Sequence, residues 1–252
     1  MVRAVVGMVE HGNAVILVTL DAEATLLDRR RADLTRGLPT HPYHHEGAWA
    51  VGRYLESPWA RPVTLTEALT LVETVTTAAL EGARQCLEQL AAAIPAHLDT
   101  IAIRTCPPLP PSVEERIRDN RTQVIADSVM YRMATATAAK ERGWRVGWYD
   151  RKNVMGQAAA ALDVADITPI LDALGKRAGP PWQAQHKLAA AAALSRAVPL
   201  GAFYRGARVD GEKTGPSLAH PAAADFQNLT VDPSAPAPAA KTPNRITFRT
   251  LD

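Results

Sequence analysis

The sequence predicts an α/β protein built on a five-stranded mixed sheet with flanking helices, in the element order βββαβαβα. Three strand-like segments, residues 5–10, 14–20 and 25–34, follow one another with only short turns between them. Two further strand-like segments, residues 100–104 and 145–149, alternate with long helical stretches. This order predicts an antiparallel meander that leads into parallel crossovers.

The second and third strands differ in their expected surroundings. Residues 14–18 are all apolar, without polar alternation, which is typical of a strand buried on both faces. Residues 25–34 carry five charged side chains, as expected of a sheet edge that must not pair with other chains. These are Asp28, Arg29, Arg30, Arg31 and Asp33.

Three helical stretches complete the predicted order. The first begins at Thr64, with Glu67 placed to complete a capping box, and its apolar residues repeat at helical spacing to residue 93. A second capping box opens a helical stretch over residues 112–143, and a last helix is predicted over residues 182–196.

The composition divides the chain into a domain and a tail. Residues 1–198 are expected to form the α/β domain, interrupted by a His- and Trp-rich insertion over residues 38–63. Residues 199–252 are rich in Pro and Ala, and we expect an extended or disordered tail.

Charge and motif content exclude several functions. The net charge of +2 is too small to indicate a nucleic-acid partner, so any basic patch must be local. Two cysteines are too few for a disulfide framework, which favours a cytoplasmic protein. No apolar run is long enough for a membrane span, and no glycine-rich phosphate loop follows a strand, so neither a membrane nor a nucleotide cofactor is expected.

Several segments carry a family resemblance. Val9-Glu10-His11-Gly12 at the first hairpin is similar to an apolar-Asp-Pro-Gly signature, and residues 101–104 stand where a strand ends in a catalytic Glu. Residues 120–149 resemble the next helix and strand, and residues 185–191 resemble a final alanine-rich helix. On these segments the chain resembles the ribonuclease H-like superfamily, most of all its RuvC-type branch of Holliday-junction resolvases.

The resemblance implies a fold and a chemistry. It implies that the first strand is central, flanked by the second and the fourth, and that only the second strand runs antiparallel to the rest. Nucleases of this kind use three or four carboxylates to hold two divalent ions. The implied function is an endonuclease acting on structured nucleic acid with Mn²⁺ or Mg²⁺, with DNA or RNA as partner and a homodimer as an admissible assembly.

The expected acids are replaced in this sequence. Glu10 is the one carboxylate kept, Arg104 stands at the second acid, and Gln185 and His186 stand at the last ones. In one interpretation, Glu10 and His186 hold a metal and Arg104 binds the scissile phosphate. In the other, Arg104 pairs with Glu10, and the domain is a catalytically degenerate module that binds nucleic acid or protein.

Two further groups of residues could supply metal ligands. His41, His44, His45 and Glu46 form a second candidate metal site, unless they belong to a polar insertion that packs over the sheet edge. Asp127 lies one helical turn before Tyr131. An exposed polar face is the default expectation for this pair, and a metal-binding role for Asp127 at the cleft is the alternative.

A local basic cluster is the candidate nucleic-acid surface. Its members are Lys140, Arg142, Arg145, Arg151 and Lys152. They could contact phosphates, or they could simply balance the dipole at the end of a helix. A third class, an actin-like nucleotide-binding relative, lacks support because the glycine-rich loops are missing.

Overall fold

The computed structural model describes residues 2–48 and 63–196. The later part of the predicted insertion, residues 49–62, and the whole predicted tail, residues 199–252, lie outside the described residues. In the part that is described, no helix is both long and apolar enough to cross a membrane.

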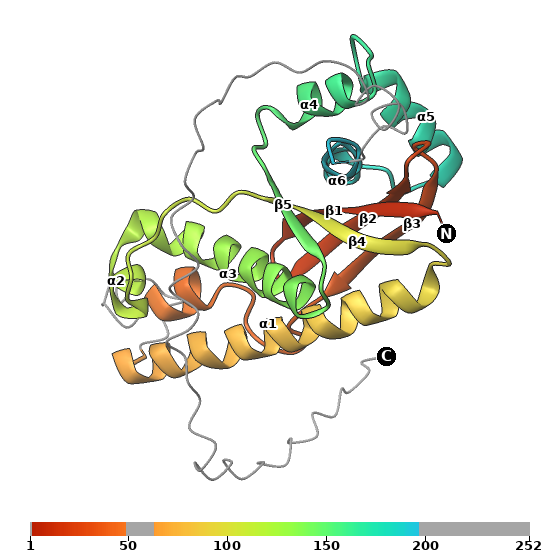
Figure 1. The fold of residues 1–252 in the computed structure, drawn as a ribbon. Coiled ribbons are helices and arrows are strands. Elements are labelled where there is room, and N and C mark those ends of the chain that lie inside the picture. Colours follow the sequence, from red (N-terminus) through yellow and green to blue (C-terminus); the bar gives the residue numbers. More distant parts are fainter. Residues whose placement is uncertain (1, 49–62, 197–252) are drawn as a thin grey trace, which may run out of the picture. The chain divides into compact units, whose positions relative to one another are not determined.

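The five strands form one mixed sheet in the order β3-β2-β1-β4-β5 (Figure 1). β1 pairs antiparallel with β2 and parallel with β4, while β2–β3 is antiparallel and β4–β5 is parallel. The strand order and directions expected of a ribonuclease H-like sheet are therefore confirmed. The strands are β1 (Arg3–His11), β2 (Ala14–Asp21), β3 (Leu26–Asp33), β4 (His97–Arg104) and β5 (Arg145–Tyr149).

Helices cover both faces of the sheet (Figure 1). On one face α1 and α3 pack against each other and against the apolar side chains of β1 and β4. On the other face α6 lies across β1 and β2 and is flanked by α4 and α5. The helices are α1 (Leu65–Ala93), α2 (Val113–Arg118), α3 (Asn120–Glu141), α4 (Val154–Ala161), α5 (Thr168–Ala178) and α6 (Ala184–Leu194).

The predicted capping boxes are present at α1 and α2. The predicted stretch 112–143, however, is two helices, because Asp119 adopts an extended backbone and accepts a hydrogen bond from the amide of Arg121. An N-cap residue has a non-helical backbone, so Asp119 ends α2 and begins α3. α4 and α5 have no counterpart in the predicted order.

α6 spans the sheet from one edge strand to the other. Before its first turn, Arg29 of β3 donates hydrogen bonds to the carbonyls of Gly179 (2.8 Å) and Pro181 (2.6 Å). After its last turn, Arg196 donates to the carbonyl of Trp148 in β5. Between these points α6 contains a run of five alanines, residues 189–193, and this run approaches β1 closely.

The closest approach is at Gly7. A Cβ atom at this position would lie 1.8 Å from the carbonyl oxygen of Ala189 and 2.8 Å from the amide nitrogen of Ala193. These are backbone atoms, which cannot move aside as the end of a flexible side chain could. Gly7 therefore sets the distance between the sheet and α6.

We predict that Gly7→Ala lowers the free energy of unfolding by about 3 kcal/mol or abolishes folding, because the helix must be displaced. The matched control is Gly156→Ala in α4, where the added Cβ meets nothing within 4 Å. This control should stabilise the protein by about 0.5–1 kcal/mol. Urea unfolding measures both, and equal stabilities would contradict the prediction.

Candidate functional site

Glu10 lies near the end of β1 and faces the α1 and α3 side of the sheet. Side chains alternate between the faces of a strand. Val6 and Met8 belong to the core beneath α1 and α3, whereas Val9 belongs to the core beneath α6. Glu10 continues the series of Val6 and Met8, and its side chain is only 8% exposed.

Two arginines bind the Glu10 carboxylate. Arg132 of α3 is 4% exposed, and its Nη2 donates to Oε1 of Glu10 at 2.5 Å. Arg104, the last residue of β4, places Nη1 3.4 Å from the same oxygen, and its side chain is 36% exposed. The pair between Glu10 and Arg132 is thus buried, and Arg104 joins it from the solvent side.

The surroundings of this pair bind the ends of three strands together. Nη1 of Arg132 donates to the carbonyl of Thr105, just after β4, at 2.9 Å. Tyr149, the last residue of β5, donates its hydroxyl to the carbonyl of Met8 in β1 at 3.0 Å. Burial raises the pKa of Tyr149; the Glu10 charge raises it further, while Arg104, Arg132 and Arg151 act in the opposite direction.

A divalent metal does not fit this arrangement. Among residues 2–48 and 63–196, no three His, Cys, Asp or Glu side chains gather closely enough to hold an ion. Both guanidinium groups contact Oε1 of Glu10, and their positive charges repel a cation from this carboxylate. The predicted ligand set of Glu10, Asp127 and His186 is therefore not formed, whereas the predicted contact between Glu10 and Arg104 is present.

His186 lies on the opposite face of the sheet from Glu10. It stands in the first turn of α6, where its Nδ1 accepts a hydrogen bond from the amide of Gln183 at 3.1 Å. Its ring stacks on Trp182 at a centroid distance of 5.8 Å. Burial lowers the pKa of His186, and the nearby charge of Arg29 lowers it further. The contacts of His186 are those of a helix-cap residue.

Asp127 is buried, which corrects the expectation of an exposed polar face for Asp127 and Tyr131. Its carboxylate accepts hydrogen bonds from the amides of Tyr43 (3.0 Å) and His44 (3.2 Å). These amides open a short π-helical turn, η1 (Pro42–Glu46). Tyr131 donates its hydroxyl to the carbonyl of Thr40 at 2.9 Å. Asp127 and Tyr131 thus anchor the described part of the insertion to α3.

The histidines of the insertion lie close together without forming a metal site. The ring of His45 is 5.3 Å from that of His41 and 4.4 Å from that of His44. Nδ1 of His41 is 3.6 Å from Oδ2 of Asp127, and burial lowers the pKa of this histidine. Among the described residues, no three side chains of this segment gather closely enough to hold a metal ion. This holds for His41, His44, His45 and Glu46.

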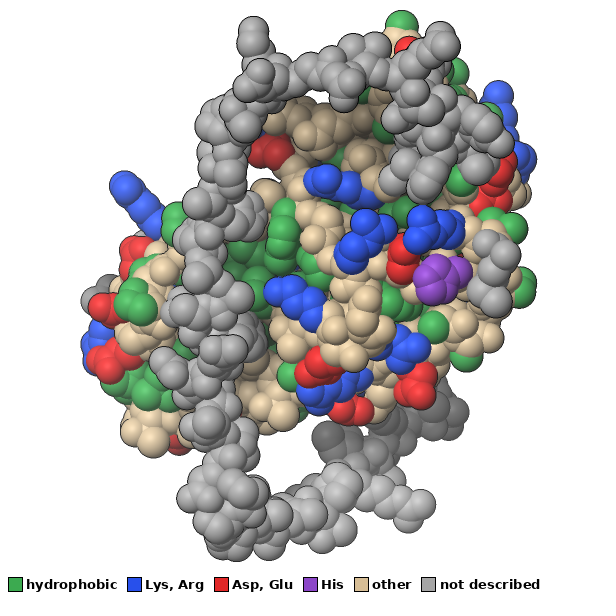
Figure 2. All heavy atoms as spheres, viewed as in Figure 1, with side chains coloured by type: hydrophobic (Ala, Val, Ile, Leu, Met, Phe, Trp, Pro, Cys, Tyr) green, Lys and Arg blue, Asp and Glu red, His purple; other side chains and the backbone are tan. Residues whose placement is uncertain are grey.

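The five predicted phosphate-binding cations do not form one patch. Lys140, Arg142 and Arg145 lie before or at the start of β5, and Arg151 and Lys152 follow its end. The five residues of β5 span roughly 13 Å, which separates the two groups. Arg145 also contacts Asp99, at 3.5 Å. Figure 2 shows Lys and Arg side chains spread over this view, with acidic side chains among them.

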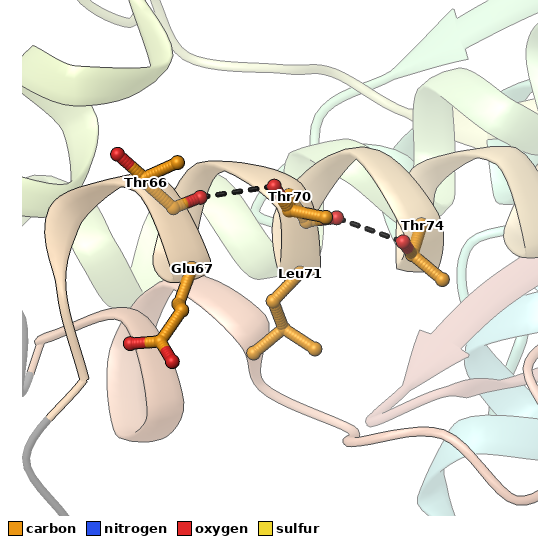
Figure 3. Close-up of a pocket in the computed structure, with 5 residues that line it drawn as sticks. All are labelled: Thr66, Glu67, Thr70, Leu71 and Thr74. Carbon is orange, nitrogen blue, oxygen red and sulfur yellow. Dashed lines mark hydrogen bonds between the residues drawn. The ribbon is translucent and has the colours of Figure 1, made fainter. Parts of the chain in front are cut away.

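A shallow hollow on α1 offers no convergent chemistry. It is lined by Thr66, Glu67, Thr70, Leu71 and Thr74 (Figure 3). The hydroxyls of Thr70 and Thr74 donate to the carbonyls one turn earlier, at 3.0 and 2.8 Å. Glu67 accepts the capping hydrogen bond from the amide of Thr64. These groups stabilise the helix that carries them.

Arg132 is a site residue that the sequence pattern did not indicate. It lies in the middle of a long helix, and Val129, Thr135 and Ala136, three or four positions away, are buried. Arginine is seldom fully buried without a charged partner. An arginine within the Ala- and Met-rich part of α3 is the signal that could have indicated a buried carboxylate nearby.

No protein-family model and no curated protein matches the chain. Among solved structures, RuvC from Thermus thermophilus in complex with a Holliday junction substrate aligns with 81% of this chain and 94% of its own, at 14% identity and a TM-score of 0.46. A second Thermus thermophilus RuvC structure aligns with 80% and 95% of the two chains, at 14% identity and a TM-score of 0.43. At this identity the similarity concerns the fold and not the role of any residue.

We predict that Arg132→Met lowers the free energy of unfolding by about 3–5 kcal/mol, because it leaves the Glu10 carboxylate buried with only the distant Arg104 contact. The double variant Glu10→Gln with Arg132→Met should recover much of this loss. As a control, Arg84→Met removes the exposed pair between Arg84 and Glu141 and should cost less than about 1 kcal/mol. Urea unfolding measures the free energy of unfolding of each variant. If the loss in the double variant equals the sum of the losses in the two single variants, the two residues are not coupled and the prediction is contradicted.

Asp127 should make stability depend on pH. Burial raises the pKa of this carboxyl from 3.8 to about 7 in the folded protein, and the charge of Glu46 adds to the shift. Between about pH 4 and 7 the folded chain keeps a proton that the unfolded chain releases, so this contribution to stability is present at low pH and is lost as the pH rises. Above pH 7 it is constant.

The test compares the wild type with Asp127→Asn across this range. The wild-type free energy of unfolding minus that of the variant should fall by about 2–4 kcal/mol between pH 4 and 7. Glu141→Gln serves as control, because its bond to Arg84 lowers the pKa of Glu141 and should give a small slope of opposite sign. A difference for Asp127→Asn that does not change with pH would contradict the prediction.

Proposed function

We propose that this chain is a catalytically degenerate ribonuclease H-like domain that binds the phosphate backbone of nucleic acid at the carboxyl ends of β1, β4 and β5 without cutting it. The observation that supports this most directly is the binding of Glu10 by both Arg132 and Arg104. In this arrangement two guanidinium groups surround one carboxylate, so the side chains at these strand ends carry a net positive charge that can attract a phosphate.

Two-ion nuclease chemistry needs carboxylates to hold the ions, activate water and stabilise the leaving oxygen. Glu10 is the expected first acid, but its Oε1 is bound by Arg132, and Arg104 stands where a second acid is expected. A guanidinium beside this position repels a divalent cation. The described side chains thus favour phosphate binding over phosphate cleavage.

The charge balance leaves cations available for a ligand. Arg132 neutralises Glu10 within the core, so the charge of Arg104, which is more than a third exposed, is in excess. Arg151 and Lys152 follow β5, the strand next to β4, and are exposed. Neighbouring strands are about 5 Å apart, so cations at their ends can contact adjacent groups of one polyanion. Because the sequence resembles enzymes that act on nucleic acid, we take the polyanionic ligand to be nucleic acid.

A metal-dependent endonuclease is the competing function, and the ribonuclease H-like strand order is the observation that favours it. The two functions differ in a cleavage assay with single-stranded, duplex and branched DNA and RNA in Mn²⁺ or Mg²⁺. We expect binding without cleavage. Cutting that disappears in a folded Glu10→Gln variant would overturn the proposal and support the nuclease.

We predict that Arg104→Ala weakens nucleic-acid binding about three- to tenfold and reduces the salt dependence of the affinity by about one phosphate contact. Fluorescence anisotropy at several salt concentrations measures both. The matched control is Arg3→Ala, an exposed arginine that contacts Asp99 at the opposite end of β1. Equal losses in the two variants would place the binding surface elsewhere.

A further inference from the structure

Cys106 lies beside the arginines of the proposed binding site. It follows β4, two residues after Arg104, and is partly exposed. Arg132 holds the preceding residue through its bond to the carbonyl of Thr105 and also interacts with the Cys106 thiol. The other cysteine of the chain, Cys86, is buried in α1.

The groups around this thiol have unused hydrogen-bonding capacity. The Arg132 side chain is only 4% exposed, and its Nε is buried without a hydrogen-bond partner among the described residues. A buried donor without an acceptor is costly. A negatively charged oxygen on the sulfur of Cys106 would give Arg132 an acceptor and Arg104 a counter-ion.

We propose that Cys106 is a modification site that hydrogen peroxide oxidises to a sulfinate held by Arg132 and Arg104. In the first step the thiolate attacks one oxygen of hydrogen peroxide, the O–O bond breaks, and sulfur is oxidised to the sulfenic acid. The other oxygen leaves as hydroxide, which takes up the proton released by the thiol and becomes water. A second peroxide repeats the transfer, giving the sulfinic acid and another water; the acid then loses its proton.

The two cysteines differ in the ways that such selectivity requires. The thiolate is the reactive form. Burial raises the pKa of the Cys86 thiol to about 11. Burial also raises the pKa of Cys106, and so does the charge of Glu10, but Arg132 and Arg104 oppose the shift, and Cys106 is partly exposed whereas Cys86 is buried. Cys106 should therefore react first, and faster as the pH rises.

Oxidation would act on the binding site, a consequence that rests on the proposed function. The sulfinate adds a negative charge next to the cations that are assigned to phosphate. It competes with the nucleic acid for Arg104 and repels its backbone. The oxidised protein should bind nucleic acid more weakly than the reduced protein.

The first experiment does not depend on nucleic acid. The full chain is treated with hydrogen peroxide, and each cysteine peptide is followed by mass spectrometry. We expect Cys106 to gain two oxygen atoms at least about tenfold faster than Cys86. Arg104→Ala should slow the reaction of Cys106 about two- to threefold, whereas Arg3→Ala should not. Equal rates for the two cysteines in the folded protein would overturn the proposal.

The second experiment measures nucleic-acid affinity after oxidation in wild type, Cys106→Ser and Cys86→Ser. Affinity should fall several-fold in wild type and Cys86→Ser and stay unchanged in Cys106→Ser. Oxidation of Cys106 without loss of affinity would overturn its regulatory consequence. If the reduced protein binds no nucleic acid, the proposed function fails, while selective oxidation in the first experiment still establishes the modification site.

Discussion

A carboxylate and a guanidinium that are both nearly sealed from water join the end of β1 to the middle of α3. Burying two charges costs several kcal/mol for each ion, and their attraction offsets this only when the geometry is good. Arg132 divides its donors between Glu10 and the carbonyl of Thr105, while Nε of Arg132 and Oε2 of Glu10 have no hydrogen-bond partner among the described residues. The position of α3 over the sheet, and with it the insertion held by Asp127, depends on this contact.

The contact between Glu10 and Arg132 also shows that the fold and the chemistry of its site are determined by different residues. A ribonuclease H-like sheet brings the ends of its central strands together, and any side chains at those ends become neighbours. In this chain the neighbours are Glu10, Arg104 and Arg132, so the same geometry that could collect metal ions collects a charge pair instead. Arg104 lies on the solvent side of this pair.

The sheet could be predicted from the sequence because its signals are local. Runs of apolar residues, a charged edge strand and two capping boxes identify the strands and the long helices. The residues that make the site depend on tertiary contacts. Glu10 and His186 share no contact because strand alternation and α6 put them on opposite faces, and no spacing in the sequence shows that. Arg132 and Asp127 lie within a helix whose partner surface is known only once the chain has folded.

The helix α6 has a mechanical consequence. Its two ends are fastened to opposite borders of the sheet, through Arg29 on β3 and Arg196 on β5, and its centre rests on Gly7 without intervening side chains. A sheet normally changes its twist by rotating its strands against one another. Because α6 is bonded to both edge strands and contacts the central strand, it resists such a change of twist. The ends of the strands therefore keep a constant spacing.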